Sequence, residues 1–275
     1  MGKSDSAFGR SQKIEDTTMG WRFINPKLKE MYGVDTMPQT AENVAAQFNI
    51  NRIDQDQFAL ASQQRTATAQ AQGFFAHEII PVNIPQRKGD PIVVDTDEHP
   101  RASTTLEALA KLKPVVTAEG TVTAGNASGI NDGAAAVLIA SEQAIQVYQL
   151  KPRAKIIAST AVGVEPRIMG FAPALAIKKL LKQANLTIEE MDVIELNEAF
   201  AAQALAVTRD LGLADDTTQV NPNGGAIAIG HPLGASGARL VTTALNQLEQ
   251  TGGTYALCSM CIGVGQGIAM IIQRV

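Results

Sequence analysis

Val193-Ile194-Glu195-Leu196-Asn197-Glu198-Ala199-Phe200-Ala201 is the stretch that decides the fold, because an apolar strand passes directly into a helix. Residues 193–196 are typical of a short buried strand, and the Ala-rich run over 199–211 predicts a helix. Such a junction points side chains and free helix N–H groups into a crevice. Asn197 is therefore a candidate site residue, although it could simply cap the helix.

The alternation of strand and helix continues on both sides of this stretch, from residue 154 to the C-terminus. Alternating elements with Ala-rich helices predict a layered α/β domain. Strands are expected over 156–158, 255–261 and 267–273, the last two as a closing hairpin, and helices over 173–183 and 237–249.

The first 152 residues follow a less regular pattern, and residues 1–39 are mostly polar. No short-period repeat is present. Helices are expected from about residue 40, over 54–73, 104–112 and 142–148, and strands over 78–82, 92–94 and 136–140.

Composition excludes several functional classes. The 275 residues are 45% hydrophobic and 18% charged, as in soluble globular proteins. The net charge of −4 argues against a nucleic-acid partner, and no apolar run reaches the ~18 residues that span a bilayer. The N-terminus has no apolar core like that of a signal peptide. With two cysteines, we expect a cytoplasmic protein without disulfides and without a metal.

A glycine-rich stretch holds a single histidine: Asn221-Pro222-Asn223-Gly224-Gly225-Ala226-Ile227-Ala228-Ile229-Gly230-His231-Pro232-Leu233-Gly234-Ala235-Ser236-Gly237. Glycine lets the backbone approach a ligand closely or adopt positive φ. His231, just before a helix, is well placed to titrate near neutral pH. The alternative is a structural turn with a locally bonded histidine. His77 and His99 have polar, surface-like neighbours, and no role is expected for them.

Cys258 and Cys261 are separated by two residues, a spacing found in zinc and redox sites. No second such pair exists in the sequence, and the flanking residues predict a strand. Residues three apart in a strand face opposite sides, so the two thiols are not expected to share a metal or a disulfide. Cys261, which precedes Gly263, Gly265 and Gly267, is the site candidate, while Cys258 is expected to pack as a small apolar residue.

Three motifs, in this order and spacing, resemble the thiolase family: Asn-Glu-Ala-Phe at 197–200, the glycine-rich stretch at 224–237, and Cys-x-Gly-x-Gly-x-Gly at 261–267. Residues 121–134 are similar to the coenzyme-A loop of that family. The similarity covers the whole chain. Residues 15–26 look most like the 3-oxoadipyl-CoA thiolases of aromatic degradation.

The resemblance implies an α/β, thiolase-like layered αβα fold and CoA-dependent acyl transfer. A 3-oxoacyl-CoA such as 3-oxoadipyl-CoA would be cleaved by CoA to acetyl-CoA and a shortened acyl-CoA. Coenzyme A would be a co-substrate, no cofactor would be bound permanently, and the full-length form would be a dimer or tetramer. For a dicarboxylate substrate, Arg22 beside Trp21 is a candidate cation.

The family's mechanism is carried over onto matching positions. His231 would be the base that activates a nucleophilic cysteine, and Cys261 the second cysteine, which handles the proton of the acetyl-CoA enolate. Asn197 would hold a water that forms one oxyanion hole with His231, and the Gly263 N–H would supply half of another. Positions matched to CoA or acyl contacts are Ser128, Met169, Phe200, Met37 and Arg101. Met37 and Met169 could equally be core residues, and Arg101 a solvated charge.

One departure from the family is large, since the nucleophilic cysteine has no counterpart and both cysteines lie in the last 18 residues. We therefore expect a loop domain over 1–129, a remnant of the N-terminal domain over 130–152, and a C-terminal domain over 153–275. Most of the N-terminal domain, on the order of a hundred residues, would be missing.

Several hypotheses accommodate this departure. The sequence could begin late within a longer thiolase, it could be a catalytically inactive or acyl-CoA-binding remnant, or it could complement a separate N-terminal chain. A redox or zinc protein is the most distant alternative. In each of the first three, the chain alone is expected to be inactive.

Overall fold

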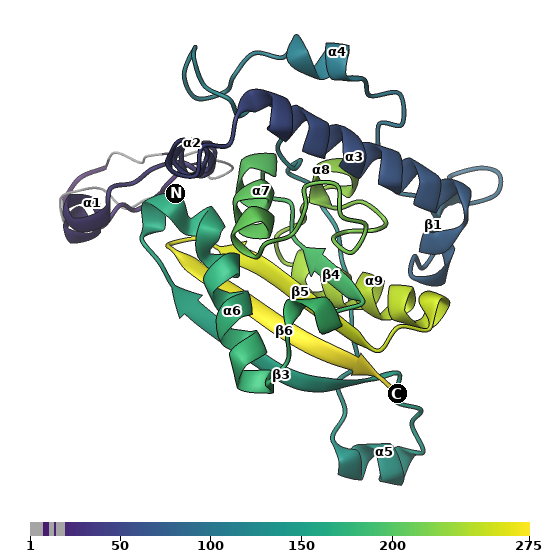
Figure 1. Ribbon diagram of the computed structural model, residues 1–275. Coiled ribbons are helices and arrows are strands. Elements are labelled where there is room, and N and C mark those ends of the chain that lie inside the picture. Colours follow the sequence, from purple (N-terminus) through teal and green to yellow (C-terminus); the bar gives the residue numbers. More distant parts are fainter. Residues whose placement is uncertain (1–7, 11–13, 15–19) are drawn as a thin grey trace.

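The computed structural model describes residues 8–10, 14 and 20–275, and its centre is a four-stranded sheet (Figure 1). The strands are β3 (Ala154–Gly163), β4 (Val193–Leu196), β5 (Tyr255–Ile262) and β6 (Gln266–Arg274), in the order β3-β6-β5-β4. β4 and β5 are parallel, whereas β5–β6 and β6–β3 are antiparallel. The layered α/β prediction is confirmed, with β3 longer than expected from residues 156–158.

Helices cover the two faces of the sheet. α6 (Ala172–Ala184) packs on one face and α9 (Ser236–Thr251) on the other (Figure 1). Successive side chains of a strand point to opposite faces. Accordingly, Ile194 of β4 belongs to the apolar cluster under α6, and Val193 belongs to the cluster under α9. Burial of such aliphatic side chains provides the main stabilisation of the fold.

A second group of helices lies over the end of the sheet where β4 and β5 finish. The 20-residue helix α3 (Arg52–Ala71) contacts α7 (Ala201–Asp210) and α8 (Ala226–Ile229), as seen in Figure 1. Asn51 caps α3 through its side chain, and α2 (Met37–Gln47) packs against α7. The remaining elements are the helices α1 (Pro26–Tyr32), α4 (Leu106–Ala110) and α5 (Glu142–Tyr148), the 3-10 turns Phe74–His77, Pro166–Phe171 and Ile188–Glu190, and the strands β1 (Val82–Ile84) and β2 (Ile92–Val94).

The carboxylate of Glu198 joins three of these parts. Glu198 is 1% exposed and follows β4 by two residues. Its side chain accepts hydrogen bonds from Ser62 Oγ of α3 (2.6 Å), from Asn221 Nδ2 (2.8 Å) and from the backbone N–H of Ile227 in α8 (3.2 Å). Burial raises the pKa of Glu198, although these donors act in the opposite direction. The loop that carries Asn197 is thereby tied to α3 and α8.

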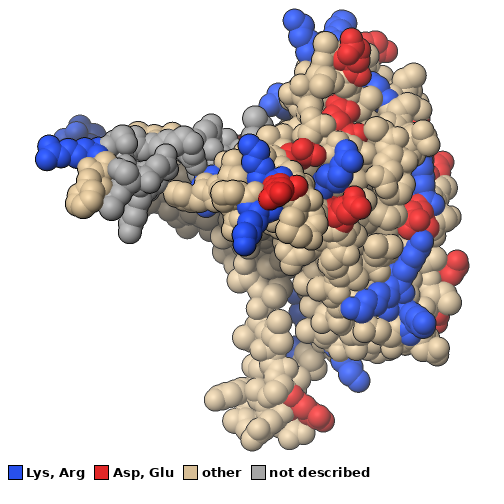
Figure 2. Space-filling view, turned by 90° about the vertical axis from the view of Figure 1, so that its left-hand side faces the viewer, with Lys and Arg blue, Asp and Glu red and all other residues tan. Residues whose placement is uncertain are grey.

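Two expected strands differ from the structure. Residues 136–140 form no strand but an exposed run, in which Leu138 is 84% and Ile139 is 70% exposed. An apolar run becomes a strand only when a neighbour accepts its hydrogen bonds, and no described strand lies beside this one. Figure 2 shows the segment with α5 as a largely uncharged lobe below the body. The strand expected at 78–82 begins at Val82 instead, after a 3-10 turn.

None of the helices in the described part of the chain is both long and apolar enough to cross a bilayer.

The role of Glu198 can be tested by replacing Ser62 with Ala. The change removes the shortest of the three hydrogen bonds to a buried carboxyl group, and we expect the free energy of unfolding to fall by about 1–3 kcal/mol. Urea denaturation followed by circular dichroism measures it. Ser103→Ala, at an exposed position, is the matched control, and equal stability of the two variants would contradict this role of Glu198.

Candidate active site

Several candidate residues meet where β4 and β5 end. Asn197 directly follows β4 and is completely buried, and its backbone N–H donates to the Ser259 carbonyl of β5 (2.9 Å). His231 precedes α9 and lies beside Asn197, with 3.4 Å between its Nε2 and the Asn197 Nδ2. The sequence placed Asn197 and His231 34 residues apart, and the fold brings their side chains together.

The hydrogen bonds of His231 define its tautomer. Ser236 Oγ donates its single proton to the carbonyl of Pro232 (3.1 Å). The same oxygen lies 2.6 Å from His231 Nδ1 and can accept from Nδ1–H, which fits the tautomer that leaves Nε2 as the acceptor facing Asn197 Nδ2. The neutral ring then carries its lone pair on Nε2, where the Asn197 amide can donate to it. This geometry suits a general base that acts through Nε2.

Burial lowers the pKa of His231, with a smaller contribution from the positive charge of Arg239. The imidazole is therefore neutral at neutral pH. Next to it, Asn197 Oδ1 is buried and has no hydrogen-bond partner among the described residues. A buried acceptor without a partner favours the binding of a water or a ligand group.

Cys261 lies in a small apolar cluster with Met169 and Ala199, against which Met37 and Phe200 pack. Burial raises the pKa of the Cys261 thiol to about 11, so the thiol is protonated at neutral pH. Cys258 faces α9 instead, within the cluster that contains Leu240. As expected for a strand, the two free cysteines lie on opposite faces of β5.

Gly263 begins the turn that connects β5 and β6. A Cβ atom added at this position would meet nothing within 4 Å, so the space beside the backbone is open. Among the described residues, the Gly263 N–H has no backbone acceptor. An open N–H that follows Cys261 by two residues can donate to a developing negative charge.

The remaining expected contacts lie around residues 126–128. The Ser128 N–H donates to the carbonyl of Ala199 (3.0 Å), and Ala127 pairs with Phe200 as an isolated bridge. Ser128 is thus held against the loop of Asn197.

Arg101 is exposed and is fixed through its backbone N–H, which donates to Gln63 Oε1 (2.8 Å). Its guanidinium has no hydrogen bond to the described residues.

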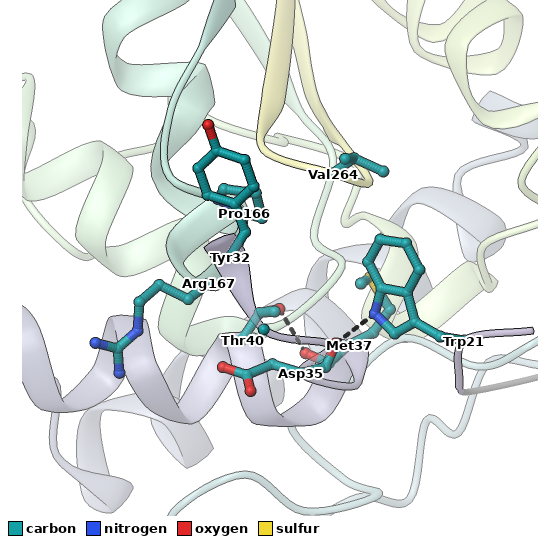
Figure 3. A pocket seen from close by; sticks show the side chains of 9 residues that line it. Trp21, Tyr32, Asp35, Met37, Thr40, Pro166, Arg167 and Val264 are labelled. Carbon is teal, nitrogen blue, oxygen red and sulfur yellow. Dashed lines mark hydrogen bonds between the residues drawn. The ribbon is translucent and has the colours of Figure 1, made fainter. Parts of the chain in front are cut away.

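A hollow adjoins the Cys261 cluster and shares Met37 with it (Figure 3). The indole N–H of Trp21 donates to the backbone carbonyl of Asp35 (3.0 Å) at its edge. Figure 3 shows the Arg167 side chain directed away from Trp21. Arg22, the sequence candidate for a carboxylate, is exposed and does not line the hollow, while residues 15–19 lie outside the described part. The lining residues are Trp21, Tyr32, Gly33, Asp35, Met37, Thr40, Pro166, Arg167 and Val264.

Sequence reasoning missed three residues of this site. Ser236 was only part of a motif, although it fixes the tautomer of His231. Asn131 accepts from the backbone N–H of His231 (3.3 Å), and His99, expected at the surface, is half-buried beside Asn131. A polar residue within a glycine-rich motif was the available signal for Ser236 and Asn131. Nothing in the local sequence indicated His99.

In the part of the chain that the structure describes, no group of three or more His, Cys, Asp or Glu side chains could hold a metal ion.

The chain matches two family models, described as the N-terminal domain of thiolase (residues 3–143) and the C-terminal domain of thiolase (residues 150–274). A beta-ketoadipyl-CoA thiolase of Acinetobacter baylyi is 84% identical over 275 residues, which are 100% of this chain and 69% of the relative. The crystal structure of an acetyl-CoA acetyltransferase of Bacillus anthracis matches with a TM-score of 0.86 at 38% identity, over 98% of this chain and 67% of that one. A human mitochondrial 3-ketoacyl-CoA thiolase in complex with CoA matches with a TM-score of 0.79 at 44% identity, over 87% and 59%.

The match to the family's N-terminal domain model bears on the expected domain division. Residues 3–143 fall within the family's N-terminal domain, so a sizeable part of that domain is present in this chain. The expectation that most of it is missing is not confirmed and stays a prediction, as do the boundaries at residues 129 and 152.

The lowered pKa of His231 predicts a pH-dependent stability. The folded state binds its proton only below the ordinary pKa of 6.5, whereas the unfolded state binds it at 6.5. The stabilisation is therefore present above pH 6.5 and is lost as the pH falls through the lower folded-state pKa. Between about pH 7.5 and about pH 5.5, we expect the wild type to lose more unfolding free energy than His231→Asn.

Urea titrations across this pH range measure the difference. His77→Asn, at an exposed histidine, is the control and should follow the wild type. Parallel curves for the wild type and His231→Asn would refute the prediction.

Proposed function

This chain belongs to the thiolase family, and we propose that it supplies the acid–base residues for CoA-dependent cleavage of 3-oxoadipyl-CoA. The observation that carries the proposal is the contrast between two buried groups. His231 is neutral with its lone pair on Nε2, and Cys261 is a protonated thiol. A base and an acid that are both in the required state at neutral pH are what a reversible proton relay needs.

The first half-reaction divides the labour between these groups. A nucleophilic thiol, which this chain does not provide, loses its proton to His231 Nε2 and attacks C3 of the 3-oxoacyl-CoA. The C2–C3 bond breaks, and the electron pair forms the enolate of acetyl-CoA. Cys261 donates its proton to C2, which releases acetyl-CoA and leaves the acyl group on the nucleophile.

The second half-reaction restores both groups. The Cys261 thiolate takes the proton of the incoming CoA thiol, and the CoA thiolate attacks the acyl-enzyme. The nucleophilic sulfur leaves and recovers its proton from His231. The product from 3-oxoadipyl-CoA is then succinyl-CoA, because a six-carbon diacyl chain loses two carbons.

Both half-reactions develop negative charge on an oxygen. In the first oxyanion hole, a water bound by the unpartnered Asn197 Oδ1 would act together with His231. In the second, the open Gly263 N–H would donate next to Cys261. Ser128 and Phe200 would contact the pantetheine and thioester, and Met37 and Met169 the acyl end. Arg101, exposed at the surface, would pair with the nucleotide phosphates.

The substrate assignment is supported by the 84% identity to a beta-ketoadipyl-CoA thiolase. The hollow lined by Trp21 and Tyr32 shares Met37 with the Cys261 cluster and so lies beside the proposed acyl end of the site.

The isolated chain is expected to form no acyl-enzyme. With a pKa of about 11, only about one in 10⁴ Cys261 thiols is ionised at pH 7, and Cys258 is still harder to ionise. After incubation with acetyl-CoA, intact mass spectrometry should show an unchanged mass. The Acinetobacter baylyi relative, treated identically, is the positive control. A stable acetyl adduct on Cys261 would contradict the acid–base role.

Activity can be tested in a hybrid, in which this chain replaces the matching 69% of the Acinetobacter baylyi relative. The hybrid should cleave 3-oxoadipyl-CoA, with a higher kcat/KM than for acetoacetyl-CoA. In the same hybrid, His231→Ala should lower kcat by about 10²–10⁴-fold, because a general base is lost.

Ser103→Ala is the matched control, since Ser103 is exposed and outside the site. Near-normal turnover of the His231→Ala hybrid would show that the base is assigned wrongly. A hybrid that prefers acetoacetyl-CoA would refute the substrate and leave the acyl transfer itself intact.

A further inference from the structure

Residues 126–131 connect the two loops of the site. At one end, the Ala201 N–H donates to the carbonyl of Asn126 (2.8 Å), at the start of α7. At the other end, the His231 N–H donates to the carbonyl of Gly129 (3.2 Å). The segment therefore contacts both the loop of Asn197 and the turn that carries His231.

Asn131 adds a side-chain contact to this backbone connection. Its Oδ1 accepts from the His231 N–H (3.3 Å), so that N–H is shared between two acceptors. Its Nδ2 lies 3.4 Å from Nδ1 of His99. An amide nitrogen can only donate, so His99 Nδ1 must accept and the ring proton must sit on Nε2. Burial and the charge of Arg101 lower the pKa of His99, which keeps this ring neutral.

The packing leaves little freedom for these groups. Gly230 has φ +92°, and a Cβ atom there would collide with the carboxamide of Asn131. A Cβ atom on Gly129 would come within 2.5 Å of His99 Cε1. The amide of Asn131 thus occupies the volume that a side chain at position 230 would need, and His99 fills the space over Gly129. Asn131 and His99 can pack against the turn only because residues 129 and 230 are glycines.

The neighbours of Asn131 in the sequence have no comparable contacts. Ile130 is 68% exposed and Asp132 is exposed, whereas Asn131 is half-buried. A single inward-facing residue in an exposed run, bonded to the backbone of the candidate base, has a positional role rather than a share in the core.

We propose that Asn131, oriented by His99, is a positioning residue that fixes the Gly230–His231 turn and with it the direction of the His231 imidazole. The ring contacts Ser236 Oγ and Asn197 Nδ2 on its two nitrogens, so a displaced turn would lengthen at least one of these contacts. The catalytic consequence of this positioning rests on the proposed function. The orientation of the His231 imidazole can be measured without enzyme turnover.

The test is nitrogen NMR of the ¹⁵N-histidine-labelled full chain, which has three histidines and so can be assigned by single substitutions. In the wild type, His231 should show the Nδ1–H tautomer and His99 the Nε2–H tautomer. In Asn131→Ala, His231 should lose its single tautomer, and its titration midpoint should rise towards the ordinary value as water reaches the ring.

The conservative variant Asn131→Asp gives a sharper signature. It keeps the acceptor for the His231 N–H, so the tautomer of His231 should survive. It replaces a donor by an acceptor opposite His99, so His99 should change to the Nδ1–H tautomer. Asp132→Ala is the matched control and should change neither histidine.

A His231 tautomer and midpoint that stay at wild-type values in Asn131→Ala would overturn the proposal. Where that variant fails to fold, His99→Ala decides, because it removes the partner of Asn131 without touching His231 and should shift His231 in the same direction. In the active hybrid, Asn131→Ala should lower kcat by about 10–10²-fold with KM for CoA unchanged. An inactive hybrid would refute the proposed function and leave the NMR result standing.

Discussion

The buried carboxyl group of Glu198 is the constraint on which the rest of the structure depends. It lies where α3, the end of β4 and α8 meet, and it can be buried there because Ser62, Asn221 and the Ile227 N–H all donate to it. Burying such a group without these donors would cost several kcal/mol. The three donors come from distant parts of the chain. Apolar packing between α3 and α8 and the hydrogen bonds between Asn221 and Leu196 also bring these parts together, and the buried carboxyl group adds a polar requirement that only this arrangement meets. Because Glu198 is held in place, the preceding residue, Asn197, is held in place as well.

The chemistry of the site follows from burial applied to two different groups. Removing water from His231 keeps a base neutral, and removing water from Cys261 keeps an acid protonated. The same low-polarity environment therefore prepares both members of the pair. Polar side chains then supply direction: Ser236 assigns the proton of the imidazole, and Asn197 faces its lone pair. Burial sets the protonation states, and hydrogen bonds set the orientation.

Local sequence predicted the regular elements well where pattern and packing agree. Residues 193–196 and 142–148 form the expected strand and helix, and the opposite facing of Cys258 and Cys261 follows from strand geometry alone. Prediction failed at 136–140, because strand propensity needs a neighbour that the described chain does not offer. It also missed α8, a single turn within a glycine-rich stretch. The candidates His231, Cys261 and Asn197 came from motifs. The role of Ser236 depends on His231 only five residues away. The roles of Glu198 and Asn131 depend on contacts across 136 and 100 residues, which local sequence does not specify.

The contact between Glu198 and Gly225 has a consequence for how such a chain can change over time. A Cβ atom at position 225 would overlap the carboxyl group of Glu198, so any side chain there competes for the space of the acid that holds the loop. Positions 198, 221 and 225 can therefore vary only as a unit. Residues 214–216 between them are exposed, and their contacts are the surface pair of Asp215 with Arg209 and the hydrogen bond from Arg65 to the Asp216 carbonyl. Sequence change is therefore expected to fall on this exposed loop rather than on residues 198, 221 and 225.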